Sequence, residues 1–128
     1  GFMGRVRLEK FGQGKIYPHE QTMSGPKADR LKLFHATGMN LSQIFGLFPD
    51  DASVISKRLD QAVAGKEALE AVDHLGVKHQ VWMIDDPATT AELSTLLADK
   101  PIFIADGHHR YETSIKHMEE REAAGQVN

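Results

Sequence analysis

Cysteine is absent from the 128 residues, which excludes disulfide scaffolds and cysteine-based zinc sites. No apolar run approaches the roughly 20 residues that a membrane-spanning helix requires, and no signal peptide is visible. The formal net charge of -3 gives no support to a general polyanion binder, so nucleic acid is not an expected partner. These absences lead us to expect a cytoplasmic protein without a membrane partner.

The composition that is present, 41% hydrophobic and 26% charged residues, is that of an ordinary globular domain. The chain is long enough to bury a core, and its length fits one domain. Its first residues, GFM, are not an ordinary translation start, and its last residues, GQVN, are not an obvious stop. We therefore expect residues 1–128 to form a single domain within a longer protein.

Helices are indicated by capping residues followed by apolar positions at helical spacing. Ser24-Gly25-Pro26 resembles a helix start, Asp50 or Asp51 can cap a second helix, and Pro87 begins a third. The spacing predicts helices over residues 27–38, 51–63, 87–99 and 108–121.

Strands are indicated by alternating or continuous apolar residues bounded by turn residues. The strand at 77–85 is apolar on both faces near its end, which is typical of a central strand. Residues 15–27 are expected to form an ordered loop or a short strand. The predicted strands are 2–9, 42–48, 67–74, 77–85 and 101–105. We therefore predict an α/β (α+β) fold, with a mixed sheet flanked by about four helices.

The segment ADGHHRYE follows a predicted buried strand and begins a predicted helix. A helix N-terminus presents unpaired N–H groups and roughly half a positive charge, so three cationic side chains there suit a bound phosphate. Gly107 allows close approach of a ligand, and Arg110 can grip a phosphate in a fork. His108 and His109 can donate hydrogen bonds or act as acid or base near neutral pH.

Two other interpretations of this segment remain open. Asp106 can cap the helix while one histidine is buried and Arg110 pairs with Glu112 or a distant acid. Alternatively, Asp106, His108 and His109 contribute to a metal site, although they are too close in sequence to converge without His19 or Glu20.

The segment YPHEQTMSGPKADR holds a second group of polar residues. Lys27 and Arg30 are about one helical turn apart and could share one anion. Glu20 is a candidate general base or magnesium ligand. His35 and Asn40 flank the end of the helix that follows and could line the same cleft. The alternative is a surface loop with solvated charges.

The segments YPHEQTMSGPKADRLKLFHATGMNLSQIFGLF and PIFIADGHHRYETS resemble the bacterial and archaeal family catalogued as domain of unknown function 1015. Members are usually much longer, which agrees with the expectation of a longer protein.

DGHHRYE also resembles the phosphate-binding helix start of the ParB-like and sulfiredoxin superfamily. His108 stands where sulfiredoxins carry their cysteine, so sulfiredoxin chemistry is not available to this chain. A free-serine kinase of that superfamily has a related D-G-x-H-R pattern and a glutamate base. The resemblance implies that Gly107, His109 and Arg110 hold nucleotide phosphates, that Asp106 orients the turn or a magnesium ion, and that Glu20 is the base.

These observations favour a kinase-like phosphotransferase that uses ATP, ADP or another nucleotide with Mg²⁺ and acts on a small hydroxylated metabolite. The catalytic candidates are Glu20, Asp106 and His108, with Asp106 and Glu20 as metal ligands. The first alternative is a non-catalytic ParB-like module that binds a nucleotide or another anion, and the second is a metal-dependent hydrolase. An open sheet edge would favour a homodimer. The predicted cofactor-binding residues are Lys27, Arg30, Gly107, His108, His109 and Arg110.

Overall fold

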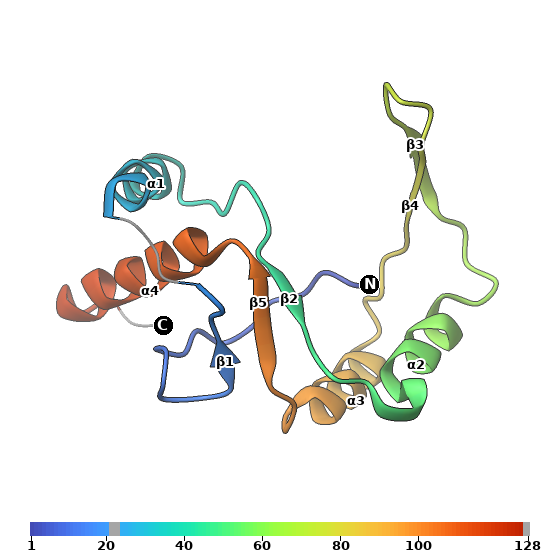
Figure 1. Cartoon of the computed structure of the whole chain (residues 1–128). Helices are drawn as coiled ribbons and strands as arrows, with labels where there is room; N and C mark the ends of the chain where they lie inside the picture. Colours follow the sequence, from blue (N-terminus) through green and yellow to red (C-terminus); the bar gives the residue numbers. More distant parts are fainter. Residues whose placement is uncertain (21–23, 127–128) are drawn as a thin grey trace. The chain divides into compact units, whose positions relative to one another are not determined.

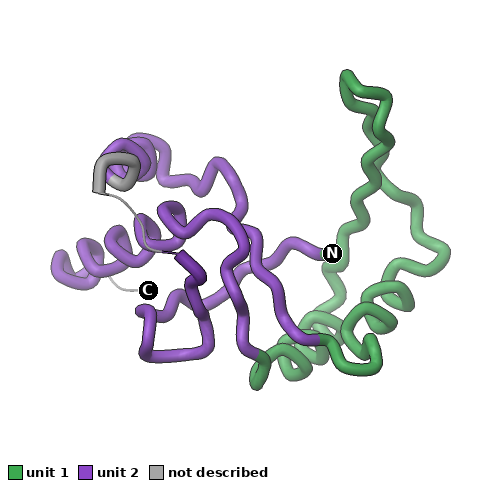
Figure 2. The backbone as a smooth tube through the Cα atoms, in the orientation of Figure 1, with its two compact units in different colours: residues 1, 50–100 green, residues 2–49, 101–128 purple. Residues whose placement is uncertain are grey.

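The computed structural model describes residues 1–20 and 24–126, and for residues 24–27 it describes the backbone alone. The chain divides into two compact units (Figure 2). The larger unit comprises Phe2–Pro49 and Pro101–Asn128, and the smaller comprises Asp50–Lys100 together with Gly1. That residues 1–128 form one domain of a longer protein stays a prediction.

A three-stranded sheet forms part of the larger unit, in the order β1-β5-β2 (Figure 1). The central strand β5 (Ile102–Asp106) is parallel to β1 (Ile16–Tyr17) and antiparallel to β2 (Phe45–Leu47). Alternate side chains of a strand point to opposite faces of its sheet. Ile104 is accordingly 1% exposed, whereas Phe103 is 48% exposed. The predicted mixed sheet is confirmed, but β5 is buried on one face only.

Two helices, α1 (Ser24–Thr37) and α4 (His108–Ala123), pack against each other in the larger unit (Figure 1). The buried core of this unit joins Ile16 and Ile104 of the sheet to Tyr111 in the first turn of α4. Tyr111 stacks on Phe11 with ring centroids 5.1 Å apart. Both helices were predicted, and Tyr111 anchors α4 at the end nearest to β5.

Helix α2 (Val54–Val63) begins the regular structure of the smaller unit, after a short 3-10 turn over Asp51–Ser53. The carboxylate of Asp50 accepts hydrogen bonds from the backbone N–H groups of Ile55 and Ser56, each at 2.9 Å. These N–H groups have no partner within the helix, so Asp50 stabilises the helix start. The structure thus assigns the predicted cap to Asp50.

Helix α3 (Pro87–Leu97) begins as predicted, with proline in its first turn. The carboxylate of Asp86 caps it by accepting a bond of 2.8 Å from the backbone N–H of Thr89. Arg58 of α2 donates to Glu92 at 2.6 Å and to the Thr89 hydroxyl at 2.9 Å. These two bonds join α2 to α3.

Strands β3 (Leu69–Val72) and β4 (Lys78–Val81) form an antiparallel hairpin whose turn contains Gly76. Every residue of both strands is exposed. The prediction that β4 is a central buried strand is therefore wrong. Within the described part of the chain β4 pairs with β3 alone, so no packed layer covers its apolar side chains.

Residues 2–9 were predicted to form a strand, and this prediction is also wrong, because the described backbone shows no ladder there. The end of this segment is held by a side chain instead. The backbone N–H of Glu9 donates to the Tyr111 hydroxyl at 3.0 Å, and that hydroxyl donates to the Glu9 carbonyl at 2.7 Å. Alternation alone cannot supply the neighbouring strand that a sheet requires.

A search of the described residues found no helix with the length and apolar character needed to cross a membrane.

Candidate functional site

The candidate site lies where β5 ends and α4 begins, at the predicted strand–DGHHR–helix junction. Gly107 occupies the left-handed region with φ +94°. A Cβ atom added there would lie 2.9 Å from Nε of Arg110 and 3.0 Å from its Cζ. The positive φ of the turn favours glycine here, and the Arg110 side chain approaches it closely.

Asp106 and Arg110 form an ion pair across this junction. Nη2 of Arg110 donates to Oδ2 of Asp106 at 2.6 Å, and Nη1 donates to the backbone carbonyl of Gln43. Gly107 at the N-cap position of α4 has no side chain to cap the helix, and the Asp106 carboxylate accepts from Arg110, so the capping role considered for Asp106 stays a prediction. The bonds to Asp106 and Gln43 hold the guanidinium in one orientation and use only part of its donor capacity.

His108 begins α4, and its side chain is fully buried. Its Nε2 accepts a hydrogen bond of 3.2 Å from the backbone N–H of His19. An imidazole nitrogen that accepts carries no proton, so neutral His108 carries its proton on Nδ1. That Nδ1 lies 3.1 Å from Oε1 of Glu20, without the alignment of a hydrogen bond. His108 therefore holds the His19–Glu20 segment against the start of α4.

His19 is the residue of this site that the sequence reasoning underused. Its Nδ1 lies 2.6 Å from the backbone carbonyl of Ile104, and a carbonyl can only accept, so Nδ1 is the donor. Its ring meets that of His108 edge to face with centroids 4.5 Å apart. Neutral His19 consequently keeps its lone pair on Nε2, as a general base requires. No local signal in the sequence marks this ring, because both contacts are to residues far along the chain.

A shallow groove lies beside Arg110 in the larger unit, bounded by α1 and the segment after it. Arg30 and Arg110 both line it, so two of the predicted phosphate ligands meet there. Asn40 also lines it, as expected, whereas His35 is not among its lining residues. The apolar part of the groove includes Phe34. Guanidinium groups beside an aromatic ring suit a ligand with both an anionic and a planar part.

The other predicted phosphate and metal ligands do not gather into one group in the described structure. His109 is half-buried in the first turn of α4, and its carbonyl accepts from the Thr113 hydroxyl at 2.7 Å. The side chain of Lys27 lies outside the described residues. Asp106 faces Arg110 and Glu20 faces His108, so within the described chain they do not join a cluster of three metal-ligating side chains.

Tyr111, in the first turn of α4, contributes to the rigidity of the site from within the core. Burial raises the pKa of its phenol, although the hydrogen bond to Glu9 opposes that change. The hydroxyl therefore stays protonated at neutral pH and keeps donating to the Glu9 carbonyl. The first turn of α4 is anchored through this bond.

The family model described as "Protein of unknown function (DUF1015)" matches residues 1–128, which is the whole chain. The chain belongs to this family. No curated protein and no solved structure matches it. In this DUF1015 chain, both segments that carried the resemblance meet at one place, because His19 and Glu20 lie against His108.

Proposed function

We propose that the chain binds the phosphates of a nucleotide at the start of α4 and transfers a phosphoryl group to a small hydroxylated metabolite. The observation that carries this proposal is the Arg110 guanidinium, held by Asp106 and Gln43 and opening with Arg30 onto one groove. Phosphoryl transfer depends mainly on positioning and on neutralising charge. An oriented guanidinium beside a helix N-terminus supplies both.

Glu20 is the proposed base. Its side chain is 54% exposed and lies against His108. His108 is in the first turn of α4, two positions before Arg110. Glu20 would take the proton of the acceptor hydroxyl as that oxygen bonds to phosphorus and the bond to the leaving nucleotide phosphate breaks. Mg²⁺ would accompany the nucleotide, with the carboxylate of Asp106 as its protein ligand. The ParB-like resemblance of DGHHR supports the same assignment.

A non-catalytic nucleotide or anion-binding module is the second candidate. It is favoured by one observation: both carboxylates at the helix start are already engaged, Asp106 with Arg110 and Glu20 with His108. A binding module would use these pairs to hold the anion site in shape. It would bind nucleotide without transferring phosphate.

Calorimetric titration with ATP, ADP and CTP in the presence of Mg²⁺ tests the binding site. Arg110→Ala removes a charged partner of phosphate and should cost about 1.5 to 3 kcal/mol of binding free energy, which is roughly ten-fold or more in affinity. Arg121→Ala, an exposed arginine at the other end of α4, is the matched control and should bind as the parent does. Equal affinity of the parent and Arg110→Ala would exclude this phosphate site.

A product assay with a panel of small alcohols and amino alcohols separates the two candidates. For the enzyme, Glu20→Gln should retain nucleotide affinity and lose most turnover, because the amide cannot accept the proton. For the module, the parent chain should bind nucleotide and form no phosphorylated product with any alcohol.

A further inference from the structure

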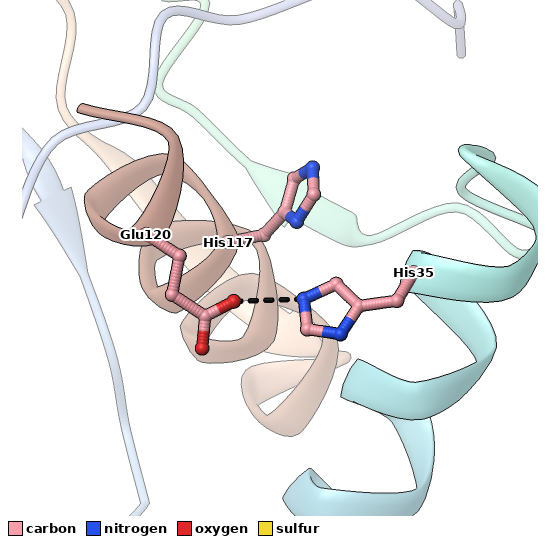
Figure 3. A group of neighbouring side chains, drawn as sticks. All are labelled: His35, His117 and Glu120. Atoms are coloured by element: carbon pink, nitrogen blue, oxygen red, sulfur yellow. Dashed lines mark hydrogen bonds and ion pairs between the residues drawn. The ribbon is translucent and has the colours of Figure 1, made fainter. Parts of the chain in front are cut away.

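A second group of polar side chains lies on the contact between α1 and α4, and the proposed nucleotide site does not use it. His35 comes from the last turn of α1, while His117 and Glu120 are three positions apart on α4 (Figure 3). Residues three apart share one helix face. The packing of α1 on α4 therefore brings three metal-ligating side chains together from two helices.

The three side chains are close enough to share an ion. One nitrogen of each histidine and one carboxylate oxygen of Glu120 all lie within 4.8 Å of one another. His35 Nε2 and Glu120 Oε2 lie 2.7 Å apart. Ligand atoms around a tetrahedral zinc ion are separated by roughly 3.4 Å, from bond lengths near 2.0–2.1 Å. Small side-chain rotations would bring the cluster to that geometry.

His117 has a ring nitrogen that is free to bind a metal ion. Its Nδ1 is buried and makes no hydrogen bond within the described structure. A buried polar atom without a partner costs stability, so such atoms are uncommon unless they serve another purpose. The ring is held by Phe34, whose centroid lies 4.5 Å away. A bound cation would pair with the histidine and offset the cost of its burial.

The donor set selects the class of ion. Imidazole nitrogen is a borderline ligand that suits zinc, copper, nickel and iron, whereas calcium and magnesium require oxygen ligands. Two histidines with one glutamate form a known zinc set that leaves a fourth position for water. The side chains of His35 and Glu120 are 49% and 42% exposed, so solvent can reach that position.

We propose that His35, His117 and Glu120 bind one divalent transition-metal ion, Zn²⁺ in the first place, which links α1 to α4. The link has a mechanical consequence. Helix α1 also carries Arg30 and Phe34, which line the groove beside Arg110. An ion at the end of α1 would hold this helix, and with it one wall of the groove, against α4. The proposed metal site does not depend on the proposed nucleotide site, so either can be disproved without affecting the other.

Titration of the untagged, metal-stripped chain with Zn²⁺ tests the proposal. We expect one ion per chain, a rise in Tm on binding, and affinity lowered about ten-fold or more by His35→Ala or His117→Ala. His79→Ala in the hairpin is the matched control, because His79 also contacts a carboxylate, Asp73, and should leave Zn²⁺ affinity unchanged. Absence of binding, or affinity unaffected by the α1 and α4 variants, would overturn the proposal.

A measurement on the parent chain avoids dependence on variants that fold poorly. X-ray absorption of the zinc-loaded parent should show nitrogen and oxygen ligands near 2.0–2.1 Å with scattering from two imidazole rings. The cobalt-loaded parent should show the intense visible bands of a tetrahedral ion. A six-coordinate ion without imidazole scattering would contradict the site.

Discussion

Gly107 shows at the scale of one residue how tightly the helix start is built. Its backbone is left-handed, and the Arg110 side chain occupies the space that a Cβ atom would take. Arg110 in turn bonds to Asp106 and Gln43. Each of these residues limits the conformation of the next, so the orientation of the guanidinium depends on a residue that has no side chain.

Gly107→Ala should therefore destabilise the chain for two reasons. A non-glycine residue at positive φ costs about 1–3 kcal/mol, and the new methyl group displaces Arg110. Gly38→Ala is the matched control, since Gly38 also has positive φ but has nothing within 4 Å of an added Cβ. We expect urea denaturation to show a larger loss for Gly107→Ala. Equal losses would mean that Arg110 moves aside without cost.

At the scale of the elements, α2 and α3 begin at capping carboxylates, Asp50 and Asp86. The pKa of Asp50 lies below its usual value, chiefly because its carboxylate accepts a hydrogen bond from the backbone N–H of Ile55 and a second one from that of Ser56. Partial burial acts in the opposite direction and raises this pKa. A carboxyl whose pKa is lowered by folding stabilises the folded state at pH values above its unfolded pKa. That stabilisation is lost as the pH falls through the folded pKa.

The Asp50→Asn variant tests this cap. Its Tm should lie below that of the parent at neutral pH, and the difference should shrink as the pH falls below about 4, where the parent carboxyl becomes protonated. Thermal unfolding followed by circular dichroism from pH 7 to pH 2 measures both. Asp51→Asn is the control for the loss of one charge. A difference that stays constant down to pH 2 would show that the charge of Asp50 is not involved.

Some elements could be predicted from the pattern of neighbouring residues alone. Pro87 correctly predicted the start of α3, and the predicted strands 67–74 and 77–85 leave between them the turn of the hairpin, because helix starts and turns depend on neighbouring residues. The alternation at Val6 and Leu8 and the apolar residues of β4 misled the prediction. Strand pairing and burial depend on what distant segments provide, and single-strand pattern carries no information about them.

At the scale of the whole molecule, the sheet of the larger unit has an apolar face that remains exposed. Tyr17 stacks on Phe103 with centroids 5.5 Å apart, and Leu47 lies opposite Phe103 in the register. All three residues are exposed: Tyr17 by 43%, Phe103 by 48% and Leu47 by 52%. Contiguous apolar surface of this kind is typical of an interface. The homodimer remains a prediction, and this face is its proposed contact.

Phe103→Ser should reduce self-association if two copies meet through this face. Light scattering over a range of concentrations should show a shift from dimer toward monomer. The control is Leu75→Ser, which changes an exposed leucine in the hairpin. A parent chain that is monomeric at every concentration would contradict the prediction, as would equal effects of both variants.

The sequence by itself determined the local features of this protein. The strand, glycine turn and helix at Asp106–Arg110 follow from residues within one short segment, as do the capped helices. Only the tertiary structure decided which side chains meet across the fold: His19 with His108, Arg110 with Gln43, and His35 with His117 and Glu120. Caps and turns are formed between neighbours in the chain. Contacts between distant segments depend on how the whole core packs, and composition and spacing do not encode that packing in any single segment.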